Sequence, residues 1–196
     1  MSEFFTYLKL GYLHITDLQG FDHILFIVAL CAVYRFIKWR EVLILVTAFT
    51  LGHSITLALS SLGYVNLNPD FIEVLIPVTI IATCISNFFY KFPKSIYKKV
   101  KNSQALRYGI TSFFGLIHGL GFSSYLKFLL GAEASITLPL LSFNIGLELG
   151  QILIVLAVLS LNFILIEIFK VKARTWNLIL SGITLGMSLM LLINRV

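Results

Sequence analysis

Charged residues are scarce in this chain, which excludes an ordinary soluble domain. Only 12% of its 196 residues are charged and 58% are hydrophobic, with a mean hydropathy of +0.94. A soluble domain averages roughly 25% charged and 45–50% apolar residues. Cysteine is also rare: Cys31 and Cys84 both fall in apolar stretches, so we expect buried packing and no disulfide framework. The N-terminus lacks the basic region and cleavage site of a signal peptide. The composition predicts an integral membrane protein.

Acidic residues are missing from the longest polar segment, residues 91–107, which contains six basic ones. Most of the fifteen Lys and Arg residues lie there or in residues 35–40 and 170–174, between apolar runs. The positive-inside rule produces this distribution, so the net charge of +6 indicates membrane topology, and we expect no nucleic-acid partner. The alternation of the loops predicts a multi-pass protein of the bacterial inner (plasma) membrane with both termini outside.

The apolar runs predict an all-α, polytopic membrane helix bundle that forms a single transmembrane domain over residues 1–196. Residues 1–19 alternate aromatic and polar groups and are too polar to span, which favours an interfacial amphipathic helix. About six transmembrane helices follow, at residues 20–37, 41–62, 71–90, 106–130, 139–169 and 176–194. The fifth is over-long for a bilayer of ~30 Å at 1.5 Å per residue, so we expect it to tilt, kink or project.

Polar side chains inside these runs point to a functional site. Ionisable groups inside a membrane are costly and usually face the bundle interior. His118 lies in the middle of FFGLIHGLGF, and further polar groups lie in FDHILF (21–26), LGHSITL (51–57) and FNIGLELGQ (143–151). His53 and His118 lie about 18 Å from the basic ends of their helices, and Glu148 about 15 Å from the other end, at helical rise. These depths predict that the three residues converge near the midplane.

Imidazole and carboxylate groups together are typical ligands of a divalent transition metal ion such as zinc, nickel or cobalt. The candidate metal ligands are Asp22, His23, His53, His118, Glu148 and the interfacial His14. We expect Asn144 and Gln151 to orient Glu148 by hydrogen bonds, and Ser54 and Thr56 to do the same for His53.

Four motifs in this order resemble the HupE/UreJ family of small bacterial membrane proteins: GFDHILF (20–26), FTLGHSITLAL (49–59), FGLIHGLGF (114–122) and FNIGLELGQ (143–151). The resemblance covers about residues 11–155. It implies an inner-membrane protein of six to seven spans associated with nickel or cobalt handling. On this chain the family's polar positions are Asp22, His23, His53, His118 and Glu148. The chain departs from the better-studied members in the spacing of His14 before Asp22 and in having a single histidine in FGLIHGLGF, which indicates a divergent branch.

Three functions remain open at this point. The first is a nickel/cobalt-type metal permease, for which the sequence shows no second polar set on the cytoplasmic side. The second is an intramembrane zinc metallohydrolase that acts from the outer face on a lipid or membrane-anchored substrate, with Glu148 or Asp22 as general base or Ser54 as nucleophile. A third is an accessory subunit of a larger membrane assembly or a homo-oligomer in the lipid bilayer.

Overall fold

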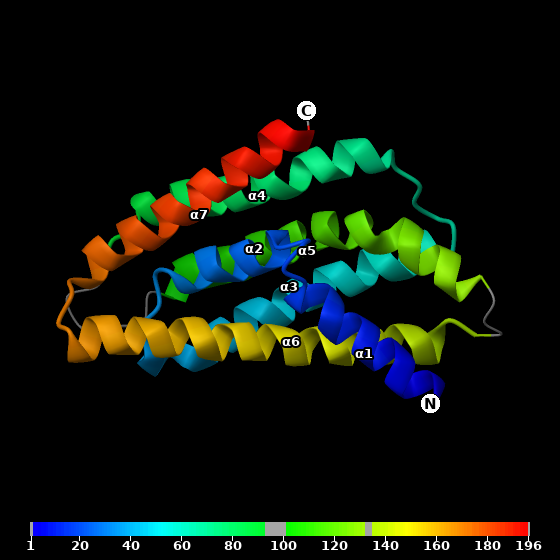
Figure 1. Ribbon diagram of the computed structural model, residues 1–196, viewed down its shortest axis with the longest axis horizontal. Helices are drawn as coiled ribbons and strands as arrows, with labels where there is room; N and C mark the ends of the chain where they lie inside the picture. The colour runs from blue at the N-terminus through cyan, green and yellow to red at the C-terminus, as the bar shows by residue number, and fades with distance from the viewer. Residues whose placement is uncertain (1, 93–100, 132–134, 196) are drawn as a thin grey trace.

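The computed structural model describes residues 2–92, 101–131 and 135–195 (Figure 1). These residues form helices and turns, and no strand occurs within those three ranges. The elements, in chain order, are α1 (Glu3–Thr16), α2 (Asp22–Cys31), the 3₁₀ turn η1 (Phe36–Lys38), α3 (Trp39–Ser61), α4 (Pro69–Phe88), α5 (Lys101–Leu130), α6 (Thr137–Phe163), the π-helical turn η2 (Ile164–Ile168) and α7 (Ala173–Arg195). The predicted all-α bundle is confirmed.

Five helical segments are long and apolar enough to cross a membrane. They are the segments that contain α3, α4, α5, α6 and α7, so the expectation of about six spans holds only approximately. The first expected span, residues 20–37, differs: its helix α2 has ten residues, about 15 Å at helical rise. Such a helix covers about half of a ~30 Å hydrocarbon core.

The helices run roughly along one long direction, and their connections gather at two ends (Figure 1). The α2–α3 connection, the end of α4 and the α6–α7 connection lie at one end, on the left of the view. This end, called the basic end below, contains the basic segments 35–40 and 170–174. The basic residues of 93–100 belong to a predicted loop that lies outside the described residues. The common placement of the two described segments agrees with the topology expected from the charge distribution.

The short α1 and α2 together occupy the place of one span. In Figure 1 α1 crosses α6 obliquely from the N-terminal end, and α2 continues toward the basic end. The contact between α1 and α6 is made backbone to backbone, because a Cβ added at Gly146 would overlap the carbonyl oxygen of Leu8. Residues 17–21 form the break between the two helices. Non-helical backbone at membrane depth is tolerated where it lies in protein or lines a cavity.

Two asparagines from neighbouring helices support the C-terminal end of α2. Asn87 of α4 donates from Nδ2 to the carbonyl oxygen of Ala29 (2.7 Å), and Asn162 of α6 donates to those of Cys31 (3.1 Å) and Tyr34 (2.9 Å). The last carbonyls of a helix have no partner within the helix. These amides therefore supply the hydrogen bonds that water would otherwise provide, which explains why a half-length helix can end inside the bundle.

The other helices pack around α2 in pairs. α4 lies beside α7, α6 lies beside α1, and α2 contacts α4, α6 and α7 between them (Figure 1). α3 and α5 pack so closely that a Cβ added at Gly115 would overlap the carbonyl oxygen of Phe49. The over-long fifth span resolves into α6 and the π-helical η2 at the basic end, where Glu167 forms an ion pair with Arg35.

Candidate metal centre

Three histidines meet at the break between α1 and α2. His14 comes from the last turn of α1, His23 from the first turn of α2, and His53 from the middle of α3. One ring nitrogen from each lies within 4.8 Å of the other two. His23 and His53 are buried, with exposed fractions of 4% and 0%. The break therefore brings two histidines that are nine residues apart in sequence onto a third from a central helix.

Several of these ring nitrogens have no hydrogen-bond partner. They are Nε2 of His14, Nε2 of His23 and both nitrogens of His53. Leaving a buried polar atom unpaired is costly, and such atoms are rare in folded proteins. Two nitrogens that share one tetrahedral zinc ion lie about 3.3 Å apart, given Zn–N bonds of about 2.0–2.1 Å. The three ring nitrogens lie within 4.8 Å of one another, so side-chain rotations that shorten these separations would bring them onto one ion.

Asp22 orients His23. Its Oδ1 lies 2.9 Å from Nδ1 of His23 and accepts the His23 backbone N–H at 2.8 Å. Its Oδ2 accepts a hydrogen bond from Arg195 of α7 at 3.3 Å. A carboxylate can only accept, so Nδ1 of His23 carries the proton and Nε2 keeps a free lone pair. A carboxylate behind a ligating imidazole is a common arrangement at metal sites. Asp22 is thus placed to position His23, and its role as a direct ligand stays a prediction.

His118 lies directly beside this group, on α5. Its ring centroid is 5.0 Å from that of His23, and its Nε2 lies 2.9 Å from Oγ1 of Thr79 on α4. Thr79 donates its only hydroxyl proton to the carbonyl oxygen of Ile76 at 2.7 Å. It must therefore accept from His118, which puts the proton on Nε2 and leaves Nδ1 as a free, buried lone pair. His118 is thus a fourth imidazole ready to receive a cation, next to the group of three.

A cavity of about 150 Å³ opens beside the histidines on the side away from the basic end. His14, His23 and His118 contribute to its wall. The acidic groups Asp17, Asp22 and Glu73 also line it, together with Arg195. Carboxylates at the mouth of a cavity raise the local concentration of cations, so the lining suits the approach of a metal ion from that side.

Glu148 does not join the three-histidine group. Its Oε1 accepts a hydrogen bond from Thr47 of α3 at 2.6 Å, and the next polar pair along α6 joins Gln151 to Thr50 at 2.8 Å. These contacts link α3 to α6. Glu148 and Gln151 thus share the face of α6 that contacts α3, but Gln151 bonds Thr50 instead of orienting Glu148.

The hydroxyls expected to orient His53 bond elsewhere. Ser54 donates to the carbonyl oxygen of Thr50 at 2.6 Å, and Thr56 to that of His53 at 3.1 Å. Side chains of this kind in helices often satisfy the backbone of the preceding turn. His53 therefore has no side-chain partner and keeps both ring nitrogens for a ligand.

The whole-chain comparison decides the family. The sequence model described as HupE / UreJ protein matches residues 1–195. The chain belongs to the HupE/UreJ family. Searches of curated proteins and of solved structures returned no match.

Two residues of this HupE/UreJ member that contact the site were not expected from its sequence. Arg195 reaches Asp22 from the C-terminal end of α7, 173 residues away in sequence, and Thr79 fixes the tautomer of His118. Arg195 had no specific signal, because basic residues at the ends of apolar spans are common. Thr79 had none, since threonine is common in membrane helices and often bonds its own backbone.

Proposed function

We propose that this HupE/UreJ chain binds a divalent transition metal ion inside the bundle and carries it across the bacterial inner membrane as a nickel/cobalt-type permease. Both termini lie on the outer side. The metal is cargo, and zinc, nickel and cobalt all suit a site built from imidazoles. The observation that supports this best is the group of His14, His23 and His53, with unpartnered nitrogens at a helix break.

The broken helix supports transport. Many secondary transporters bind their substrate near the midplane at discontinuous helices, where unwound backbone lines the site. Here residues 17–21 interrupt a span that α1 and α2 share. The break also separates the ligands onto different elements, with His14 on α1 and His23 on α2. A small movement of α1 against α6 therefore changes the coordination of the ion, which is what capture followed by release requires.

His118 provides a second position for the ion. Its free Nδ1 faces away from Thr79, and its ring packs at 5.0 Å from His23. Exchange of one imidazole ligand for another moves a cation in small steps without leaving it unligated. Transfer from His14, His53 and His23 toward His118 is thus the first step inward from the outer cavity.

The zinc metallohydrolase alternative shares the ligand set, since three histidines with one open position form a catalytic zinc site in some enzymes. Its other requirements have less support. Asp22 is held by His23 and Arg195, Glu148 bonds Thr47, and Ser54 donates to its own helix. A general base must lie within hydrogen-bond reach of the metal-bound water or one water away. The described geometry therefore favours the permease.

Reconstituted vesicles test the proposal. We expect wild-type protein to take up nickel, cobalt or zinc ions, and His23→Ala to reduce uptake at least about tenfold because one ligand is lost. Glu148→Gln is the matched control, since it alters an intramembrane polar group outside the three-histidine group. Elemental analysis of the purified protein separates the alternatives. Tightly retained zinc without uptake would support the hydrolase. A protein that neither retains a metal ion nor takes one up would refute metal binding.

A further inference from the structure

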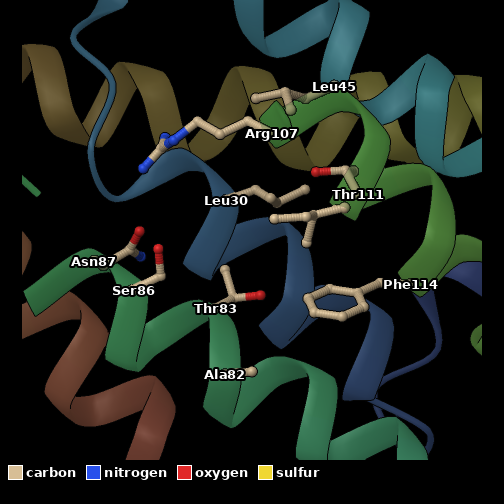
Figure 2. A pocket seen from close by; sticks show the side chains of 10 residues that line it. Leu30, Leu45, Ala82, Thr83, Ser86, Asn87, Arg107, Thr111 and Phe114 are labelled. Carbon is tan, nitrogen blue, oxygen red and sulfur yellow. The ribbon is translucent and has the colours of Figure 1, made fainter. Parts of the chain in front are cut away.

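A second cavity lies on the other side of the histidines, toward the basic end. It has a volume of about 220 Å³ and lies among α2, α3, α4 and α5 (Figure 2). Figure 2 shows Phe114 at one side and Arg107, Ser86 and Asn87 around the other part of the wall. Thr83 and Thr111 contribute hydroxyls. The rest of the wall is apolar and consists of Leu30, Leu45, Ala82 and Ile110. A few polar groups thus lie in a mostly apolar cavity, in the half of the bundle where the sequence had shown no route for a cation.

An aromatic layer separates the two cavities. Phe26 and Phe49 are almost fully buried, and their rings pack 4.9 Å apart. Both lie 5.1 Å from the ring of His118, and Phe114 lies 6.0 Å from Phe26. Phe114 and His118 are one helical turn apart on α5, about 6 Å at helical rise. His118 lines the outer cavity and Phe114 the inner one, so the layer is about one residue thick.

The two cavities differ in chemistry. The outer one presents imidazoles and carboxylates. The lining residues described for the inner one include neither, and its one charged group is Arg107. The guanidinium of Arg107 stacks over Tyr90 at 4.7 Å and donates to Tyr34 Oη at 3.2 Å. Hydroxyl and amide oxygens with a nearby positive charge bind a borderline divalent cation such as zinc, nickel or cobalt weakly. The inner cavity therefore suits release and opposes retention.

We propose that the inner cavity is a water-filled release chamber for the metal ion, and that Phe26, Phe49 and Phe114 form the gate that closes it from the histidine site. This deepens the proposed function and rests on it. Hydrophobic constrictions are known to close aqueous paths by excluding water. The described structure has the gate closed, with the histidines joined to the outer cavity. Opening requires a rearrangement of the Phe114 side chain, which lies next to the inner cavity.

Cysteine accessibility tests the chamber independently of transport. The background is the full chain with Cys31→Ala and Cys84→Ala, both of which are buried positions. Single cysteines are then placed in the inner cavity (Thr83→Cys, Thr111→Cys) and in the outer cavity (Glu73→Cys). A further one replaces Ile80, which is buried in the same cluster as Phe26 and Phe49 (Ile80→Cys). A charged, membrane-impermeant thiol reagent is added to vesicles of each orientation. The two inner positions lie on different helices, so a folding defect in one variant leaves the other informative.

We expect Thr83→Cys and Thr111→Cys to react only from the basic end, Glu73→Cys only from the opposite end, and Ile80→Cys from neither. Adding Phe114→Ala to Thr83→Cys should speed labelling from the opposite end roughly tenfold, because the constriction widens. Reaction of the inner cysteines with a lipid-soluble maleimide alone would mean that acyl chains fill the cavity and would overturn the proposal. Labelling of Thr83→Cys or Thr111→Cys from both ends, with Phe114 unchanged, would also overturn it.

The labelling experiment and the metal-binding experiment can fail independently of each other. If His23→Ala leaves metal binding unchanged while the labelling stays one-sided, the metal site is wrong and the chamber stands as an aqueous cavity of unknown cargo. If metal binding requires His23 but labelling contradicts the chamber, only the gate and release route fail. Glu148→Gln in the Thr83→Cys background controls for general loosening of the bundle, and we expect its labelling to match the parent.

Discussion

Nδ1 of His23 lies 2.9 Å from Oδ1 of Asp22, and this contact directs the other ring nitrogen into the three-histidine group. The contact joins neighbouring residues at the first turn of α2. It is reinforced by Arg195, which donates to the second carboxylate oxygen at 3.3 Å. The position of His23 is thus set by the start of one helix and the end of another.

Asp22→Asn should weaken metal binding by roughly 10–100-fold, the usual cost of altering a residue that orients a ligand. The amide keeps the shape but loses the charge that favours protonation of Nδ1 of His23. Titration calorimetry with nickel, cobalt or zinc in detergent measures the affinity. Glu148→Gln removes an intramembrane carboxylate outside the group, and we expect it to change affinity less than about threefold. Equal effects of the two substitutions would contradict the assigned role of Asp22.

His118→Ala should reduce metal uptake more than metal binding. The group of three excludes His118, so we expect the affinity to stay within a few-fold of the wild type while uptake falls at least about tenfold. Thr79→Val should act in the same direction but less strongly, because it removes the acceptor that holds the His118 tautomer. Binding and vesicle uptake are measured on the same preparations. Complete loss of bound metal in His118→Ala would instead make His118 a primary ligand.

Gly146→Ala should loosen the contact between α1 and α6. The added methyl group would overlap the carbonyl oxygen of Leu8, and overpacking of this kind costs about 1–3 kcal/mol. His14 lies on the same helix as Leu8, so metal affinity should fall together with the thermal transition temperature. Gly186→Ala is the matched control, since nothing lies within 4 Å of a Cβ built there. A Gly146→Ala protein as stable as this control would show that the two helices separate easily.

Asn162→Leu should destabilise the end of α2. Asn162 donates to two carbonyl oxygens near that end and accepts from the indole N–H of Trp176 at 2.7 Å. Leucine has a similar volume but leaves the Tyr34 carbonyl and the Trp176 indole N–H unpaired, which costs about 1–3 kcal/mol per buried group; the Cys31 carbonyl keeps the backbone N–H of Tyr34 at 3.0 Å. Thermal unfolding in detergent measures the loss, and Ser160→Ala at an exposed position of α6 is the control. An unchanged transition would indicate that water reaches the end of α2.

Most of the helical architecture could be predicted from hydropathy. A membrane core forces every backbone polar group to find a partner within its segment, so long apolar runs must be helices. α3, α4, α7 and the pair α6–η2 begin and end within a few residues of the predicted bounds. The exception is the first span. Residues 20–37 are apolar enough to cross, but the helix ends at Cys31 because Asn87 and Asn162 satisfy its last carbonyls. Partners on distant helices leave no mark on a hydropathy profile.

In the candidate site, too, the sequence predicts some features and only the tertiary structure decides the others. The cost of placing imidazoles in an apolar run was enough to select His23, His53 and His118 from the sequence alone, and the structure places His53, His118 and His14 around His23. Sequence depth could not separate the ligand group from its neighbours, because depth specifies height along a helix and leaves direction around it undetermined. Only the packing of α3 against α6 turned Glu148 toward Thr47, and only the approach of α7 gave Asp22 its second partner. The residue types determined that a polar site exists within the membrane; the helix break and the crossing angles decided which of those residues share it.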